Sequence, residues 1–410
     1  MSLLSQLSTG RGWAASFQHR DFRFLWTATV VQSVGMGMEF VALGWVVFEL
    51  TNSAFWVGVS SAARMAPFFF LGIVSGAVAD RVDRRIFIRW ITLLGSAMAG
   101  LTGLVLHVYY GPVWPIIALS VGMGSVWAFT MTLRQAYTYD IVGPESALNG
   151  MSLATLSQQL GGVVGSLAAG VIIERAGIAN QYMAIGACYA LSLGVLMWTR
   201  EPGLAAARTT QSVLQNLVGY VEILRTNRTL LLLMMLAGVI EIFGFTHQSL
   251  LPVFAKDVLG VGAFGLGIMS AFRQGGGIVG LVVLAGLGNF RRKGLMLFII
   301  AGAFGAGEMA FWLGGNFFSF VLILSFINAC AMAIDTLNRT LMQENVSNEE
   351  RGRAMGSWVL SIGIGPVGHL GVGAMGERFG APMTLLINGS ILLGVSVASG
   401  LGLKRVRRLP

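Results

Sequence analysis

The sequence has few charged residues and almost no cysteine. Only 11% of its 410 residues are charged, whereas 55% are hydrophobic. An average soluble domain has about 25% charged residues, so this chain cannot cover a water-exposed surface of its size. The composition therefore excludes a soluble enzyme, a nucleic-acid-binding protein and a disordered chain. The two cysteines, Cys188 and Cys330, lie within apolar runs, which excludes a disulfide framework and indicates small core residues.

The sequence also lacks the short motifs of common catalytic and cofactor sites. It contains no phosphate-binding loop, zinc signature or nucleophile motif, so we expect no enzymatic activity, no cofactor and no metal. The first residues, 1–13, lack an apolar segment of signal-peptide length, so the first apolar run is expected to be retained. Any energy for work must then come from a source other than bound ATP.

Long apolar runs dominate what is present, and each is long enough to span a bilayer. They lie near 24–48, 55–79, 86–109, 113–137, 152–173, 180–199, 229–254, 262–288, 294–313, 316–340, 353–376 and 381–403. We therefore predict an all-α membrane protein with twelve transmembrane helices.

The basic residues indicate the orientation of these helices. Most Lys and Arg residues lie in the connections on the side of the two termini, and only Arg175, Lys256 and Arg378 lie in the opposite connections. The positive-inside rule then places both termini in the cytoplasm. The longest polar connection, 200–228, contains Leu214 and Leu217 among apolar residues at helical spacing, which predicts an amphipathic helix on the inner membrane surface.

The two halves of the sequence resemble each other. Glu174-Arg175-Ala176-Gly177 matches Glu377-Arg378-Phe379-Gly380, and Ser61-Ala62-Ala63-Arg64 matches Ser270-Ala271-Phe272-Arg273. We predict two six-helix halves, 1–199 and 229–410, related by a pseudo-twofold axis and joined by the linker 200–228. Such halves typically enclose a substrate site near the midplane of the membrane.

Two polar connections carry candidate gate residues. The first contains Gly76, Asp80, Arg81, Arg84 and Arg85, where Asp80 could pair with Arg84 and face the positive end of a neighbouring helix. The alternative is a basic loop that only sets topology.

The second connection follows the tenth apolar run and contains Glu350, Arg351 and Arg353. Its alternating charges suit an ion-pair network that closes an inner gate together with the Asp80 loop. The alternative is a solvated turn.

These motifs carry a resemblance to a known family. The residues Gly76, Asp80-Arg81 and Arg84-Arg85 resemble the conserved loop motif of the major facilitator superfamily, with Asp83 where that motif usually has glycine. Residues 343–355 and 19–26 are similar to segments of the branch that contains the enterobactin exporter. The resemblance covers the whole chain and implies the major facilitator fold, a small-molecule substrate and alternating access. It also implies that the first, fourth, seventh and tenth helices line the cavity.

Two glycine-rich runs lie in the fifth and eleventh apolar segments. Gly162 and Gly165 in the first correspond to Gly365 and Gly368 in the second, and Pro366 permits a bend there. Exporters of the superfamily have a Gly-Pro pair in the fifth helix, which this chain lacks. We therefore interpret these glycines as sites of close helix packing.

Charged residues within the apolar runs are the functional candidates, because burying a charge in a membrane is costly. Glu39, Glu241 and Asp335 are the proton-coupling candidates, with Glu39 first because burial favours the neutral form of a carboxyl group. The alternatives are a structural pair of Glu39 with an arginine and a same-helix pair of Asp335 with Arg339. Glu308 is interpreted as structural.

The candidate cavity residues are Arg64, Arg273, Trp127, Phe243 and His247. A cavity rich in aromatic side chains suits bulky amphiphilic ligands. His247 and His369 could instead be hydrogen-bonded core residues.

The function that these patterns predict is proton-coupled export of small amphiphilic molecules, siderophore or drug-like, across a bacterial inner membrane. The expected partners are a small-molecule substrate, protons and membrane lipid, with no nucleic acid, and a monomer suffices. The alternatives are nutrient uptake or facilitated passage, lysolipid flipping and, as a different class, a non-transporting receptor.

Overall fold

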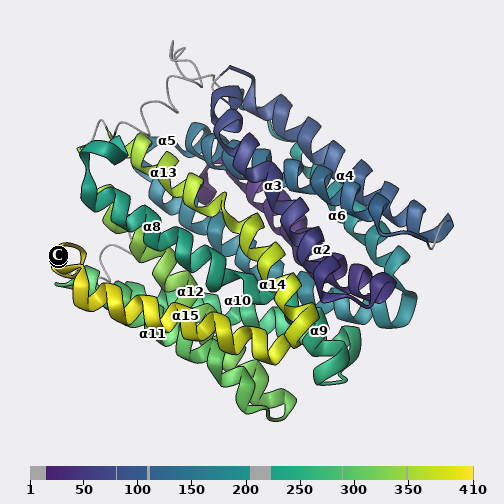
Figure 1. Ribbon diagram of the computed structural model, residues 1–410. Coiled ribbons are helices and arrows are strands. Elements are labelled where there is room, and N and C mark those ends of the chain that lie inside the picture. Colours follow the sequence, from purple (N-terminus) through teal and green to yellow (C-terminus); the bar gives the residue numbers. More distant parts are fainter. Residues whose placement is uncertain are drawn as a thin grey trace. The chain divides into compact units, whose positions relative to one another are not determined.

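The computed structural model describes residues 15–79, 81–108, 111–203, 223–288, 290–347 and 350–409. Throughout these ranges the chain is helical and forms no strand, which confirms the predicted all-α class (Figure 1). The long helices are α2 (Arg20–Thr51), α3 (Ala54–Ala79), α4 (Arg84–Val108), α5 (Trp114–Ala176), α6 (Ile178–Leu196), α8 (Arg228–Phe243), α10 (Gly262–Gly286), α11 (Lys293–Ala310), α12 (Phe317–Glu344), α13 (Arg351–Ile362), α14 (Gly365–Phe379) and α15 (Ala381–Gly402). Shorter segments are η1 (Ala15–Gln18), η2 (Phe245–Leu250), α9 (Leu251–Val253), η3 (Phe254–Val258), η4 (Phe311–Leu313) and α16 (Lys404–Arg407).

The number of membrane-spanning helices is consistent with the predicted twelve. Ten segments of the described chain are long and apolar enough to cross a membrane. One of them, α5, has 63 residues and is interrupted at Gly143 (φ 70°) just before Pro144, so it contains two helices. The apolar helix α6 adds a further 19 residues. The connection predicted at 138–151 is therefore helical except at Gly143.

The chain forms two compact units that interleave along the sequence. Unit 1 comprises 1–42, 70–110 and 122–210, and unit 2 comprises 43–69, 111–121 and 211–410. Two segments from the first half of the sequence thus belong to unit 2. The division into halves 1–199 and 229–410 stays a prediction from the sequence repeat, and most of the predicted linker helix in 200–228 lies outside the described residues.

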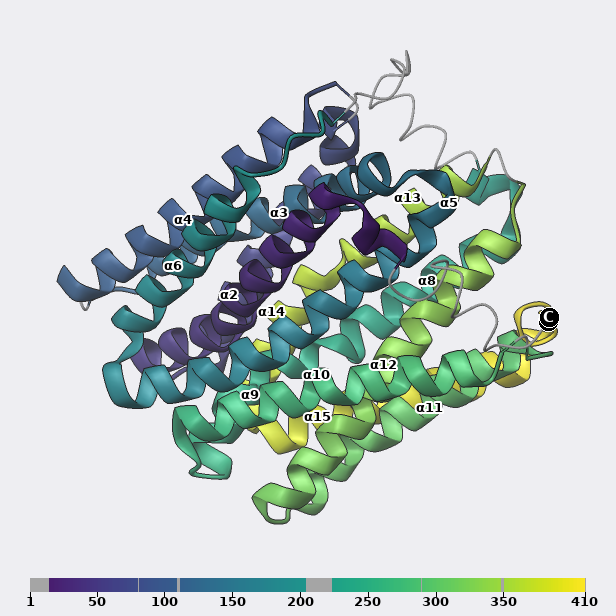
Figure 2. The same cartoon turned by 180° about the vertical axis from the view of Figure 1, so that it is seen from behind.

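Unit 1 is built around helix contacts that small residues permit. Figures 1 and 2 show α4 lying along α6. A Cβ atom added at Gly37 of α2 would lie 2.5 Å from the carbonyl oxygen of Gly162 in α5, so the two backbones are in contact. This confirms the close packing predicted for the first glycine-rich run. At one end of unit 1, Phe22, Ile88 and Tyr137 join in a buried apolar cluster.

In unit 2, α10 packs along α12 and α11 packs along α15, as both views show (Figures 1 and 2). The bend predicted at Pro366 is present, because α13 ends at Ile362 and α14 begins at Gly365. Gly368 of α14 contacts α8, where an added Cβ would lie 2.8 Å from the Cα atom of Ile242. The second glycine-rich run is therefore also a packing surface.

The segment 43–69 joins unit 2 through α14. An added Cβ at Gly373 of α14 would lie 2.9 Å from the Cα atom of Gly58 in α3. The Oε2 atom of Glu377 accepts hydrogen bonds from Ser53 Oγ (2.9 Å) and from the backbone N–H of Phe55 (3.3 Å). The carboxylate of Glu377 thus binds the N-terminal end of α3, where helices favour negative charge.

The sequence repeat is also visible in local backbone conformation. Gly177 connects α5 to α6 with φ 83° and ψ 165°, and Gly380 connects α14 to α15 with φ 80° and ψ 158°. Side chains rarely adopt a positive φ, so both turns require glycine. The Glu-Arg-x-Gly signature therefore encodes the same turn in both units.

Candidate functional site

Helix α8 is broken in the middle of the predicted seventh span. It ends at Phe243, and after Gly244 the chain continues as the 3-10 helix η2. The predicted span over 229–254 lies within one apolar segment, Arg228–Val258, in which the helix type changes at Gly244. Phe245 follows Gly244, and the next four residues, Thr246-His247-Gln248-Ser249, are polar. The side chains of the last three find partners on α10, α11, α12 and α14.

His247 is fully buried at this break, with 1% of its surface exposed. Its Nδ1 atom lies 2.7 Å from the carbonyl oxygen of Gly244, so Nδ1 carries a hydrogen. Its Nε2 atom lies 3.4 Å from the Nδ2 atom of Asn328 in α12, which also donates to the carbonyl of Leu324. An amide NH₂ donor facing Nε2 fits a neutral imidazole with its hydrogen on Nδ1.

Glu308 of α11 lies beside His247 and is completely buried, with 0% exposed surface. Its Oε1 atom is 3.4 Å from Nδ1 of His247. Neither carboxylate oxygen accepts a hydrogen bond from any side chain or backbone group in the described part of the chain. Within the described part of the chain, the Glu308 carboxyl thus lies beside the His247 imidazole and accepts no hydrogen bond.

The rest of η2 is tied to α10 and α14. Gln248 Oε1 accepts a hydrogen bond from Nη1 of Arg273 (3.3 Å), and Ser249 Oγ lies 2.7 Å from Nδ1 of His369. His369 Nε2 lies 2.9 Å from the sulfur of Met65 in α3. The alternative interpretation of His247 and His369 as core residues with partners is compatible with these contacts.

Arg64 and Arg273, which occupy equivalent positions of the sequence repeat, both belong to unit 2. Both are half-buried, and the charge of Arg64 acts on Arg273 and on His369. Two guanidinium groups are therefore held in one neighbourhood despite their mutual repulsion. Guanidinium groups bind carboxylate and other oxyanions well.

The predicted proton-coupling residues lie in different surroundings. Asp335 pairs with Arg339 on the same helix (2.7 Å) and accepts a hydrogen bond from Nε1 of Trp358 (3.1 Å), which confirms the expected same-helix pair. Glu241 of α8 is 8% exposed, and an added Cβ at Gly365 would lie 3.0 Å from its Oε1 atom. Glu39 is 2% exposed in α2 and belongs to unit 1, so it does not share a unit with the other two.

The two aromatic cavity candidates are both half-buried. Trp127 lies in α5 within unit 1, and Phe243 is the last residue of α8 in unit 2. Phe243 therefore stands immediately before the break at Gly244.

In unit 1, the gate motif forms an ion pair that the sequence did not indicate. Both Asp140 oxygens accept hydrogen bonds from Nη1 of Arg84, at 2.7 and 2.8 Å. Asp80, the partner expected for Arg84, lies outside the described residues, whereas Gly76 lies in α3 and Arg81 is exposed in the turn that follows. Arg84 is therefore bound to α5.

Asp83, which replaces the usual glycine of the motif, binds backbone groups. Its Oδ1 atom accepts hydrogen bonds from the N–H groups of Arg85 (2.9 Å), Ile86 (3.3 Å) and Gly203 (3.4 Å). The first two lie in the opening turn of α4, so Asp83 caps this helix. The third belongs to residues 197–203, which we term the post-α6 segment.

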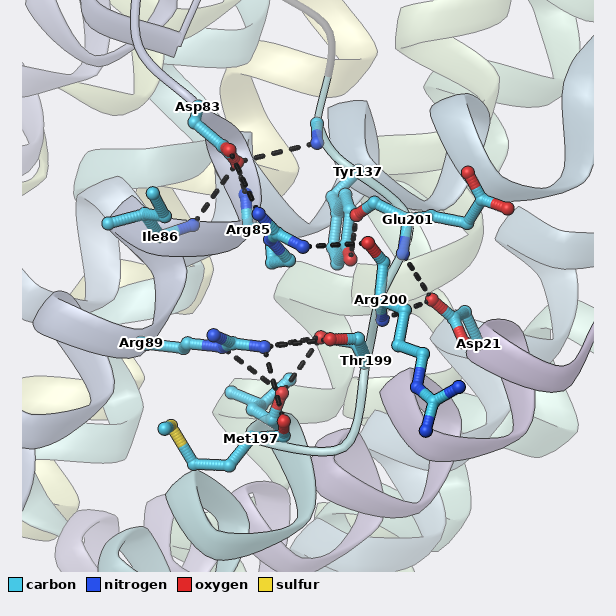
Figure 3. Close-up of polar contacts among 12 residues, drawn as sticks. Asp21, Asp83, Arg85, Ile86, Arg89, Tyr137, Met197, Thr199, Arg200 and Glu201 are labelled. Atoms are coloured by element: carbon cyan, nitrogen blue, oxygen red, sulfur yellow. Dashed lines mark hydrogen bonds and ion pairs between the residues drawn. The ribbon is translucent and has the colours of Figure 1, made fainter.

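The post-α6 segment is held by side chains from three helices of unit 1 (Figure 3). Asp21 of α2 accepts hydrogen bonds from the N–H groups of Arg200 and Glu201, both at 2.5 Å. Arg85 and Arg89 of α4 donate to the carbonyls of Arg200 and Thr199, at 2.6 and 2.8 Å. The Tyr137 hydroxyl of α5 donates to the Glu201 carbonyl (2.8 Å). Arg85 of the gate motif and Arg89 thus fix the chain where it leaves α6, a role that sequence spacing did not indicate.

The second charged connection is described only in part. Glu350 accepts hydrogen bonds from the N–H and Oγ of Ser347, at 3.3 and 3.2 Å. The side chains of Arg351 and Arg353 lie outside the described residues. The ion-pair network between this connection and the Asp80 loop therefore stays a prediction.

Comparison with known proteins identifies the family. The model of the family described as "transmembrane secretion effector" matches residues 11–407. The staphyloferrin A transporter of Staphylococcus aureus (strain NCTC 8325 / PS 47) is 23% identical over 373 residues, which cover 90% of this chain and 92% of that protein. The enterobactin exporter EntS of Salmonella typhi is 24% identical over 422 residues, covering 96% of this chain and 95% of that protein.

Solved structures support the fold. The nucleoside transporter NupG superposes with a TM-score of 0.76 at 15% identity, covering 94% of this chain and 99% of NupG. An inward-facing bacterial homologue of the human lysosomal transporter Spinster gives a TM-score of 0.73 at 15% identity, covering 95% and 97%. The chain is thus a multi-pass membrane transporter, not an enzyme, and it belongs to the transmembrane secretion effector family of the major facilitator superfamily.

Proposed function

We propose that this transporter exports small amphiphilic molecules, of siderophore or drug-like chemistry, in exchange for protons. The observation that carries the proposal is the break of α8 after Phe243, which gathers polar and titratable side chains from several helices inside an apolar unit. Irregular backbone at membrane depth is tolerated where it is buried in protein or lines a water-filled cavity. Transporters commonly place substrate and coupling-ion sites at such breaks.

The relatives and the arginines support the substrate class. Two relatives are named for their substrates, staphyloferrin A and enterobactin. Arg64 and Arg273 provide two positive charges for anionic oxygen atoms of a substrate, and the aromatic rings of Phe243 and Trp127 suit its apolar part. An amphiphilic anion uses both kinds of group.

Buried carboxyl groups support the coupling to protons. Glu39 and Glu241 are each more than nine-tenths buried, so two carboxyl groups lie inside the helical units. Asp335 is the third candidate, but Arg339 and Trp358 stabilise its charged form.

The cycle we propose is a rocking of the sequence halves 1–199 and 229–410. The inner gate would be formed by the Asp80 loop and by the connection that contains Glu350, Arg351 and Arg353. Both termini would face the cytoplasm of a bacterial cell, because the basic connections lie on their side of the inner membrane.

Proteoliposomes test the proposal. The internal pH is followed while a panel of siderophores and amphiphilic dyes is added to the purified full-length protein. Antiport predicts a compound-dependent proton flux that Glu39→Gln abolishes. Transport without proton movement would replace antiport by facilitated passage or lipid flipping. Retained pH-driven transport in Glu39→Gln would remove Glu39 from the coupling site.

A further inference from the structure

The carboxyl group of Glu308 and the imidazole of His247 form a second titratable site in unit 2, distinct from Glu39, Glu241 and Asp335. We propose that this pair binds the coupling proton, with the proton held on the Glu308 carboxyl group. The inference rests on the proposed proton-coupled transport, and it replaces the structural interpretation of Glu308.

The hydrogen bonds of His247 fix how the pair shares its protons. Nδ1 donates to the Gly244 carbonyl at 2.7 Å, and Nε2 faces the amide donor of Asn328 at 3.4 Å. Both ring nitrogens of a neutral imidazole are thereby satisfied. His247 can offer Glu308 only a share of the Nδ1 hydrogen, at 3.4 Å.

An ionised Glu308 is poorly compensated in this arrangement. A buried carboxylate is normally stabilised by two or more hydrogen bonds or by a cation. Glu308 is 0% exposed, and its two oxygens accept no hydrogen bond from the described residues. The conformation seen here therefore suits a protonated, neutral Glu308.

Other titratable groups face His247 from neighbouring helices and prevent a second positive charge. The charge of Arg273 on α10 acts on His247, as does His369 on α14. Asn328 of α12 and the ring of Phe304 in α11 fill the remaining sides, the ring centroid of Phe304 being 6.0 Å from that of His247. Protonation turns an ionised Glu308 carboxylate into a neutral group, whereas protonation of His247 would add a second positive charge beside that of Arg273. Of these groups, Glu308 is therefore the one that can take up a proton.

The position of His247 couples the proton to helix movement. His247 lies in η2, and the next two residues of the same short segment bind Arg273 of α10 and His369 of α14. A movement of α10 or α14 that shifts η2 would separate His247 from Glu308 or bring it closer. The affinity of Glu308 for a proton then changes with conformation, which is the requirement for coupling.

Infrared difference spectroscopy of the purified full-length protein tests the site without any substrate. A protonated carboxyl group gives a carbonyl stretch that shifts in D₂O. We expect this band near neutral pH, a component of it that is lost in Glu308→Gln, and retention of that component in Glu174→Gln, which removes an exposed carboxylate of α5. Glu39→Gln and Glu241→Gln identify any contribution of the other two buried carboxyl groups. A band whose intensity is unchanged in Glu308→Gln would overturn the proposal.

Two further variants keep the test decisive if Glu308→Gln fails to fold. Glu308→Asp keeps a carboxyl group but moves it away from Nδ1, so the band should remain with a changed titration midpoint. His247→Gln should also change the midpoint, because it replaces the imidazole that lies 3.4 Å from Glu308. Midpoints unchanged in both variants would overturn the pairing.

Transport measurements separate this inference from the proposed function. With a compound that the wild-type protein moves, Glu308→Gln should lose accumulation driven by a pH gradient and keep exchange of labelled for unlabelled compound. Retained gradient-driven accumulation would overturn the inference alone. If the wild-type protein moves no compound of the panel, the proposed substrate class fails, and the infrared result still decides the proton site.

Discussion

Three carboxylates of unit 1, Asp21, Asp83 and Asp140, and the carboxyl group of Glu308 in unit 2 have different surroundings. Asp21, Asp83 and Asp140 each accept two or more hydrogen bonds from described groups. Glu308 accepts none. A fully satisfied polar network rigidifies a structure, whereas an unsatisfied buried group is costly to keep charged.

The difference separates structural charges from functional candidates. The arginines of the gate motif would be taken as functional residues on sequence alone, but Arg84 binds α5 and Arg85 binds the post-α6 segment. Glu308 belongs to no recognisable motif, yet its environment is the one that favours a change of protonation. In this protein, the number of hydrogen bonds that a charged group makes thus separates structural from functional candidates better than its charge alone does.

The largest effect on stability is expected when one partner of the Arg84–Asp140 pair is removed. Asp140→Ala leaves the Arg84 guanidinium, only 7% exposed, without its carboxylate. Losing one partner of a buried pair lowers the free energy of unfolding by about 3–5 kcal/mol. Thermal unfolding of the detergent-purified protein measures the loss. The double variant Arg84→Gln/Asp140→Asn should recover part of it, and a loss below about 1 kcal/mol for Asp140→Ala would contradict a structural role.

A smaller loss is expected when a methyl group is placed in the contact between α4 and the post-α6 segment. In Gly203→Ala the new Cβ would lie 2.5 Å from the Cβ and 2.8 Å from the backbone nitrogen of Arg84. Such overpacking costs about 1–3 kcal/mol. Gly194→Ala is the matched control, because nothing lies within 4 Å of its added Cβ. Equal melting temperatures for the two variants would show that the segment is not tightly held.

Removing the helix cap tests the residue that departs from the family motif. Asp83→Ala deletes the acceptor for the first turn of α4 and for the N–H of Gly203, with an expected loss of about 1 kcal/mol. Asp83→Asn keeps an acceptor oxygen and should lose less. The same unfolding measurement applies, and a stability of Asp83→Ala equal to that of the wild-type protein would argue against the cap.

The smallest effect on stability is expected at Glu308. Glu308→Gln replaces a buried carboxyl group that accepts no hydrogen bond, so its free energy of unfolding should stay within about 1 kcal/mol of the wild-type value or rise. Thermal unfolding of Glu308→Gln and of Asp140→Ala under the same conditions compares the two sites directly. A loss as large as that of Asp140→Ala would place Glu308 among the structural charges.

The sequence predicted the helical class because apolar runs of membrane-spanning length are a local signal. The bend before α14 was also predictable, since Pro366 is present in the sequence. The break of α8 was missed because the apolar run continues on both sides of it. The signal was nonetheless there, in Gly244 and in the four consecutive polar residues that come after Phe245, Thr246-His247-Gln248-Ser249.

Pairing between distant residues could not be predicted. Arg84 pairs with Asp140, 56 residues away, which the sequence did not indicate, whereas the predicted pair with Asp80 involves a residue outside the described part of the chain. His247 was recognised as a cavity candidate and Glu308 was not, because only the packing of α11 against η2 brings them together. Sequence spacing indicates which residues share a helix, and it carries no information on which helices are neighbours.

The glycine contact between α3 and α14 has a consequence for biosynthesis. Gly58 leaves the ribosome roughly 300 residues before Gly373, which at about 5–20 residues per second corresponds to a delay of about 15–60 s. During that interval the N-terminal end of α3 has neither its glycine neighbour nor the carboxylate of Glu377. The second helix to enter the membrane is thus among the last to reach its final contacts, and assembly of unit 2 can be completed only after nearly the whole chain has been made.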